Sequence, residues 1–263
     1  MLLAACSSGV DAIAVVANAP GSVGLGQQRV LVALIDEATG QYLASPDLDV
    51  VATLRDRIGS PLGEYEAEFV WVVPEARGLY SFHMDIPGAG TFQLTFEAGD
   101  LGRLGPVGLV TIDDPPMVEP GEAAPLSETR TLSTDDLADL TSDPNPDPAF
   151  YEMSVAEAVA AGPSVIVFGT PAWCTSQACG PLLDQVKALS VDFPDLNYVH
   201  VEVYENIHVS SRDDLILVPS VVEWGLPSEP WVFVTDSAGR VSASFEGAAS
   251  DRELADAFAA VSR

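Results

Sequence analysis

The chain has 263 residues, and 48% of them are hydrophobic, so it is long enough for one large domain or two small ones. Its 11 basic and 39 acidic residues give a formal net charge of −28. This charge argues against binding nucleic acid or anionic lipid headgroups through a general electrostatic field, and it favours a cationic partner or simply high solubility. No apolar run reaches the roughly 20 residues that a membrane-spanning helix needs.

The chain opens with MLLAACSSG, in which small residues precede Cys6. The LAAC stretch resembles a bacterial lipobox, the motif after which the cysteine is lipidated and becomes the first residue of the mature protein. This resemblance implies that residues 1–23 are a signal remnant and tether. It also implies an extracytoplasmic protein of the cell envelope, anchored to the membrane by lipid, in a compartment that permits disulfides. A chance LAAC sequence is the alternative.

Residues 24–112 alternate between apolar and polar positions and are interrupted by turns rich in glycine and proline. In GLYSFHMDIPGAGTFQLTFEAG, the residues Tyr80, Phe82 and Met84 fall on one face before a Pro-Gly-Ala-Gly turn. Several short strands with this punctuation predict an antiparallel β-sandwich. The pattern resembles the small immunoglobulin-like domains of bacterial envelope proteins, a type of domain that usually serves as a scaffold or binding module.

Residues 113–148 change in character, with stretches such as DDPPMVEPGEAAP and STDDLADLTSDPNPDP. Proline and acidic residues dominate this segment, and large apolar residues are few. Such a composition buries too little surface to offset the entropy lost on ordering. We therefore expect an extended, self-repelling linker between two domains.

Residues 149–263 read as an α/β domain in the order α-β-α-β-α-β-β-α. Two helices begin with capping boxes, one formed by Ser154 and Glu157 and the other by Ser250 and Glu253. The run SVIVFG is continuously apolar, which is typical of a strand covered on both faces. Two cysteines follow this strand in the stretch PAWCTSQACGPLLDQV.

The order of elements and the position of these cysteines resemble the thioredoxin fold. VIVFGTPAWC is similar to the family's strand and active-site segment, including Trp173 before Cys174, and GPLLDQV is similar to the following helix with its proline. EPWVFVTDSAGRV is especially similar to extracytoplasmic thioredoxin-like proteins. The chain is thus identified as a thioredoxin-like lipoprotein with an N-terminal immunoglobulin-like domain.

The chain departs from the family pattern in two ways. The cysteines are spaced C-x4-C in place of C-x-x-C, and Phe168 stands where the family often carries a buried acid that accepts a proton. A second alignment would place Cys179 on the first cysteine of the family motif, with Leu182 replacing the second. We prefer the alignment on Cys174, because it keeps Trp173, the strand and the helix proline in place.

Physical chemistry assigns different roles to the two thiols. Cys174 precedes the helix, where the helix dipole and unpaired backbone N–H groups lower the pKa of a thiol, so it is the predicted attacking sulfur. Cys179 is the predicted resolving thiol. A disulfide needs Cα atoms within about 7 Å, whereas five helical residues rise about 7.5 Å, so we expect the helix to begin near residues 176–178. A permanent structural disulfide is the alternative, although so short a loop contributes little entropy.

The resemblance also implies a substrate-binding surface around the cysteines, formed by Trp173, Glu229 and Pro230. Pro230 would be the family's cis-proline, in a loop that faces the cysteines and binds an extended partner chain. Glu229 would then lie near Cys174, where its carboxylate opposes thiolate formation and favours a basic partner peptide.

Three functions remain open at this point. The first is an envelope thiol–disulfide oxidoreductase that acts on protein thiols or disulfides through Cys174 and Cys179 and needs no cofactor. The second is a copper-handling protein in which both cysteines and His208 bind a soft ion, while His200 is a packed or edge residue. The third is a non-catalytic module whose sandwich carries the binding function.

Overall fold

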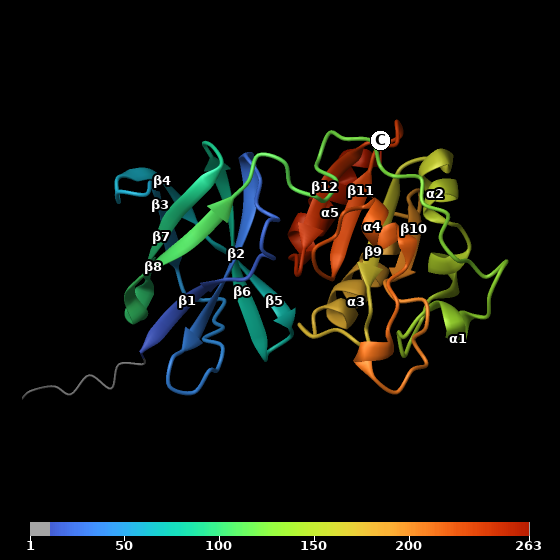
Figure 1. Cartoon of the computed structure of the whole chain (residues 1–263), viewed down its shortest axis with the longest axis horizontal. Coiled ribbons are helices and arrows are strands. Elements are labelled where there is room, and N and C mark those ends of the chain that lie inside the picture. The colour runs from blue at the N-terminus through green and yellow to red at the C-terminus, as the bar shows by residue number, and fades with distance from the viewer. Residues whose placement is uncertain (1–10, 263) are drawn as a thin grey trace, which may run out of the picture. The chain divides into compact units, whose positions relative to one another are not determined.

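The computed structural model describes residues 11–262, and Figure 1 shows the chain as a cartoon. The chain is mostly β and divides into two compact units. The first unit comprises residues 11–18, 23–70 and 75–113, and the second is built mainly from residues 114–262. None of the helices in the described part of the chain is long and apolar enough to cross a membrane.

The first unit contains two antiparallel four-stranded sheets. The sheet with the order β1-β2-β6-β5 consists of β1 (Ala12–Val16), β2 (Gly26–Asp36), β6 (Arg77–Ile86) and β5 (Glu68–Val73). The sheet with the order β4-β3-β7-β8 consists of β4 (Pro61–Glu66), β3 (Val50–Arg55), β7 (Gly90–Ala98) and β8 (Gly102–Thr111), with the 3₁₀ turn η1 (Gly99–Leu101) between the last two strands.

The two sheets share one hydrophobic core, which makes the first unit a sandwich. Tyr80, Phe82 and Met84 all point into this core, as the period-two pattern predicts for one face of a strand. The Phe82 ring of β6 lies 5.9 Å from the Phe96 ring of β7, in the opposite sheet. The prediction that this part of the chain forms an antiparallel sandwich is therefore confirmed.

The prediction of a tether over residues 1–23 is wrong for its second half. Strand β1 pairs with β2 in antiparallel register from Ala12↔Asp36 to Val16↔Val32, and Ala14 is buried in the core. The apolar sequence AIAVV has the β-branched composition of a strand, and the next strand along the chain, β2, supplies its partner. Cys6 and the lipobox lie outside the described residues.

The second unit is organised around a mixed four-stranded sheet with the order β10-β9-β11-β12. Strands β9 and β10 run parallel, β11 runs antiparallel to β9, and β12 runs antiparallel to β11. The strands are β9 (Ser164–Gly169), β10 (Asn197–Glu202), β11 (Trp231–Thr235) and β12 (Val241–Glu246). The parallel pair joins strands separated by a helical crossover, as parallel pairing requires.

Helices cover both faces of this sheet. Val165 and Val167 of β9 pack with residues of α3 and α5, whereas Ile166 and Phe168 pack with residues of α2 and α4. The two-sided burial predicted for SVIVFG is therefore confirmed, as are both capping boxes. The helices are α1 (Leu137–Leu140), α2 (Val155–Ala161), α3 (Cys179–Ser190), α4 (Pro219–Glu223) and α5 (Asp251–Val261), and the 3₁₀ turns are η2 (Pro148–Tyr151) and η3 (Arg212–Asp214).

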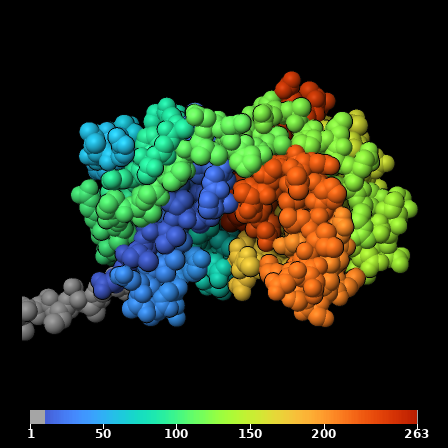
Figure 2. All heavy atoms as spheres, viewed as in Figure 1, coloured from blue at the N-terminus to red at the C-terminus, as the bar shows by residue number. Residues whose placement is uncertain are grey.

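The expected linker over residues 113–148 is packed instead of extended. Residues 114–148 belong to the second unit, and Figure 2 shows this light-green segment lying against the orange and red residues of the same unit. Met117 and Leu140 enter the cores on the two faces of the sheet, and Lys187 of α3 binds Asp143 at 2.7 Å. Individual contacts with distant residues offset the self-repulsion that the composition predicts.

Candidate functional site

The two cysteines lie in and just after the loop that joins β9 to α3. Cys174 and Cys179 form a disulfide, and their Cα atoms are 6.1 Å apart. The loop folds back so that Cys174 reaches the first residue of the helix, which is the geometry that closure requires. Helix α3 begins at Cys179 with Ala178 as its N-cap residue, slightly later than the start predicted near residues 176–178.

The residues between the cysteines hold the loop in this conformation. Gln177 adopts a positive φ of 60°, which residues other than glycine rarely adopt. The hydroxyl of Ser176 lies 3.2 Å from Cys174 Sγ and accepts the Ala178 N–H at 3.3 Å. Backbone conformations of this kind are concentrated at functional sites, where surrounding contacts maintain them.

The two sulfur atoms have different environments. Cys179 is 1% exposed, whereas Cys174 is only partly buried, so the prediction that Cys174 is the more exposed thiol is confirmed. Cys174 Sγ accepts the backbone N–H of Cys179 at 3.2 Å, which places it at the start of α3 as expected. A backbone N–H that donates to the sulfur and the positive end of a helix dipole both favour a thiolate at this position.

The loop that precedes β11 meets the cysteines from the other side. The Glu229–Pro230 peptide is cis, so this prediction is confirmed. A Cβ built on Gly169, at the end of β9, would lie 3.4 Å from Cys179 Cβ and 3.8 Å from Pro230 Cβ. Gly169 thus marks the point where β9, the start of α3 and the Pro230 loop converge.

Trp173 and Glu229 are linked through Arg212, which the sequence interpretation did not single out. The Arg212 guanidinium donates to the Trp173 carbonyl, and the Trp173 indole N–H donates to the Ile207 carbonyl at 3.1 Å. Burial raises the pKa of Glu229, and the positive charge of Arg212 opposes this rise. The stretch SSRDD carries no local pattern that marks Arg212, because its partners come from distant parts of the chain.

Two buried polar side chains lie on β10. Burial lowers the pKa of His200 to about 4, so its imidazole is neutral at pH 7, and the Tyr151 hydroxyl lies 2.7 Å from its Nδ1. His200 is 4% exposed, which agrees with its interpretation as a packed residue. Burial also raises the pKa of Glu202, while hydrogen bonds from the hydroxyl and N–H of Ser142, at 2.6 and 2.9 Å, oppose this rise.

The copper alternative does not fit the geometry. His208 is exposed, and its Nε2 lies 2.9 Å from the Asp139 carboxylate. Within residues 11–262 the structure brings together no group of three or more histidine, cysteine, aspartate or glutamate side chains that could hold a metal ion. The expected set of Cys174, Cys179 and His208 is therefore not assembled.

Comparisons with known proteins add little to this geometry. No protein-family model matches the chain, and no curated protein matches it. Among solved structures, the chain is similar to the Lin-41 filamin domain, with 15% sequence identity and a TM-score of 0.25. The match covers 38% of this chain and 93% of that domain.

Proposed function

We propose that the protein is a thiol–disulfide oxidoreductase that acts on protein thiols or disulfides through Cys174 and Cys179. The observation that carries the proposal is the asymmetry of the pair. Cys174 is the more exposed sulfur, and it accepts a backbone N–H at the start of α3. An attacking thiol must be accessible and must favour the thiolate, whereas a resolving thiol only has to reach it from inside.

The topology of the second unit supports its assignment as a thioredoxin-like domain. A central strand leads directly into the cysteine loop and α3, the next strand pairs parallel to it, and the last two strands run antiparallel. The first unit, a sandwich of two antiparallel sheets, supports the companion proposal of an immunoglobulin-like domain.

The chemistry follows from thiol–disulfide exchange. The Cys174 thiolate attacks one sulfur of a partner disulfide, the partner's S–S bond breaks, and its other sulfur leaves as a thiolate. The Cys179 thiolate then attacks Cys174 in the mixed disulfide and releases the second partner thiolate. Two electrons pass to the partner, and the Cys174–Cys179 disulfide forms. The reverse sequence oxidises a partner dithiol.

The location of this activity is part of the proposal. We place the protein in the cell envelope, anchored by lipid on Cys6, since the LAAC stretch supports export and envelope compartments permit disulfides. Cys6→Ala should then release the protein from membranes. Unchanged membrane association would show that Cys6 is not the anchor.

Trapping of mixed disulfides tests the activity. Cys179→Ser should accumulate mixed disulfides with envelope proteins, whereas the matched variant Cys174→Ser should accumulate none. In the reduced wild-type protein, alkylation at pH 6–7 should label Cys174 before Cys179. Earlier labelling of Cys179 would reverse the two roles. A native disulfide that resists dithiothreitol would show that the pair is structural.

A further inference from the structure

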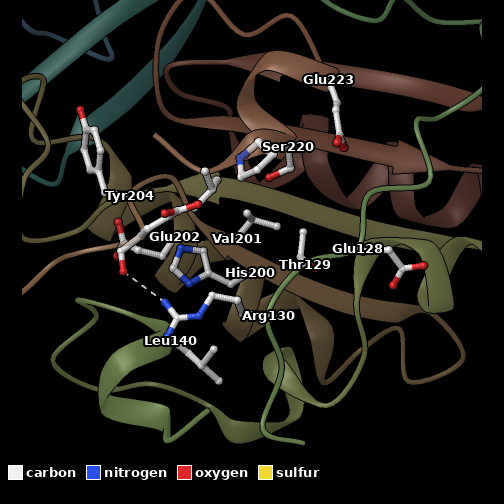
Figure 3. A pocket seen from close by; sticks show the side chains of 13 residues that line it. Glu128, Thr129, Arg130, Leu140, His200, Val201, Glu202, Tyr204, Ser220 and Glu223 are labelled. Atoms are coloured by element: carbon white, nitrogen blue, oxygen red, sulfur yellow. Dashed lines mark hydrogen bonds between the residues drawn. The ribbon is translucent and has the colours of Figure 1, made fainter. Parts of the chain in front are cut away.

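The second unit contains a cavity of about 230 Å³ beside the edge strand β10. Residues 128–130 of the packed segment form one wall, and the end of β10 and the start of α4 form the other. Figure 3 shows His200 and Glu202 between Arg130 on one side and Ser220 on the other. At about 30 Å³ per water molecule, this space holds several waters or one compact organic ligand.

Three deeply buried polar side chains, those of His200, Glu202 and Ser220, line the cavity. These residues are only 4%, 6% and 4% exposed. Ser220 Oγ has no hydrogen-bond partner among the described residues. The Glu202 carboxylate accepts from Ser142 and interacts with the Thr170 hydroxyl, and the His200 ring interacts with the backbone of Gly169. Nearly all buried polar groups in proteins are hydrogen-bonded, so the unpaired Ser220 Oγ atom beside the buried Glu202 carboxylate indicates a site for a polar guest.

The charged side chains around the cavity indicate the sign of the charge that a ligand there should carry. Four carboxylates line it, and Arg130 is the cationic side chain among the lining residues. The Arg130 guanidinium is already engaged, because it binds the Asp135 carboxylate at 2.6 Å and the carbonyls of Asp139 and Glu205 at 3.0 and 3.2 Å. The uncompensated charge is negative, and it comes from Glu128, Glu202, Glu205 and Glu223.

We propose that this cavity binds a compact organic cation, a primary ammonium or a guanidinium, whose N–H groups donate to Glu202 Oε1 and Ser220 Oγ. An ammonium or guanidinium group supplies several donors and a positive charge together, which matches a cavity with an unpaired hydroxyl and excess carboxylates. A metal ion fits less well, because no group of three or more ligating side chains is assembled in the described residues. The site does not involve the disulfide and goes beyond the proposed redox function.

Titration calorimetry of the full chain tests this assignment. Ethylammonium and methylguanidinium should bind saturably with one site, whereas acetate and ethanol should not bind. Glu202→Gln should weaken cation binding at least about tenfold, because a hydrogen bond to a charged group is lost. The matched variant Glu152→Gln changes an exposed carboxylate outside the cavity and should bind as the wild type does.

A second variant keeps the test decisive if Glu202→Gln does not fold. Ser220→Val fills part of the cavity without changing its charge and should also abolish binding. The proposal would be overturned if neither cation bound saturably, or if Glu202→Gln or Ser220→Val bound the cations with wild-type affinity. The cavity would then be a site for water. The double variant Cys174→Ser/Cys179→Ser should bind the cations unchanged, so the result is independent of the redox proposal.

Discussion

At the scale of single residues, burial decides the chemistry of His200. Its ring is enclosed by protein, Nδ1 contacts the Tyr151 hydroxyl, and the pKa falls to about 4 because burial penalises the charged form. An unfolded chain exposes the same imidazole with an ordinary pKa of about 6.5. The folded protein therefore resists protonation over a pH range in which the unfolded chain accepts a proton.

This difference predicts a loss of stability in mild acid. As the pH falls from about 6.5 to about 4, the unfolded chain binds a proton at His200 that the folded chain excludes, and the free energy of unfolding should fall by about 3 kcal/mol. His200→Gln lacks this group and should lose correspondingly less. Urea unfolding of both proteins at pH 7.5 and 4.5 measures the difference. Parallel losses in the two proteins would refute the argument.

At the scale of elements, α3 connects the cysteine loop to the packed segment over residues 114–148. Its single lysine, Lys187, lies between two carboxylates, Asp143 at 2.7 Å and Asp184 at 2.8 Å. The Asp143 side chain is 5% exposed, whereas the Asp184 side chain is 69% exposed. The two ion pairs therefore share one cation but differ in burial, so only the inner pair should matter for stability.

The two aspartates provide a matched comparison. Asp143→Asn leaves a largely buried lysine without its inner partner and should cost about 2 kcal/mol of unfolding free energy. Asp184→Asn removes a solvent-exposed partner of the same lysine and should cost at most about 0.5 kcal/mol. Chemical denaturation of the two variants gives the comparison. Equal losses would mean that burial does not separate the two pairs.

At the scale of the whole molecule, the chain has separate hydrophobic cores in its two units. The sandwich core contains residues of both its sheets, whereas the second unit has one core on each face of its sheet. Leu54 lies in the sandwich core and Phe258 in the core that α3 and α5 cover, and both side chains are fully buried. Units with their own cores can unfold as separate cooperative transitions.

Calorimetry of the full chain should therefore resolve two transitions. Leu54→Ala should lower one of them, at a cost of about 2–5 kcal/mol, and Phe258→Ala should lower the other by a similar amount. Each variant should leave the remaining transition at its wild-type temperature. If both variants lower the same transition, the two units unfold as one.

Features with local causes were predictable from the sequence. The alternation at Tyr80, Phe82 and Met84 specifies one face of a strand, and the Ser154 and Ser250 capping boxes each depend on residues three positions apart. The role proposed for Cys174 also has a local cause. The helix that creates the electrostatic environment of its sulfur follows it closely in the sequence.

Features that depend on distant partners were not predictable. By composition the packed segment resembles a linker, whereas the pairing of Asp143 with Lys187 and the burial of Met117 and Leu140 show that it packs against the second unit. Arg212 reaches the Trp173 carbonyl across 39 positions of sequence, and no local pattern indicates that contact. Periodicity reports burial along one element, but it does not report which elements meet.

The position of Lys187 has a practical consequence for labelling chemistry. It is the only lysine in the chain, and both of its carboxylate partners lie within 3 Å of the amine. Reagents that acylate side-chain amines need the neutral amine, which two carboxylates disfavour. Amine-directed cross-linkers, dyes and resins therefore have one lysine to react with, Lys187 in the second unit, whose amine is hindered, and none in the sandwich. Carboxylates, which number 39 among the side chains, offer the better handle for attaching this protein to a surface.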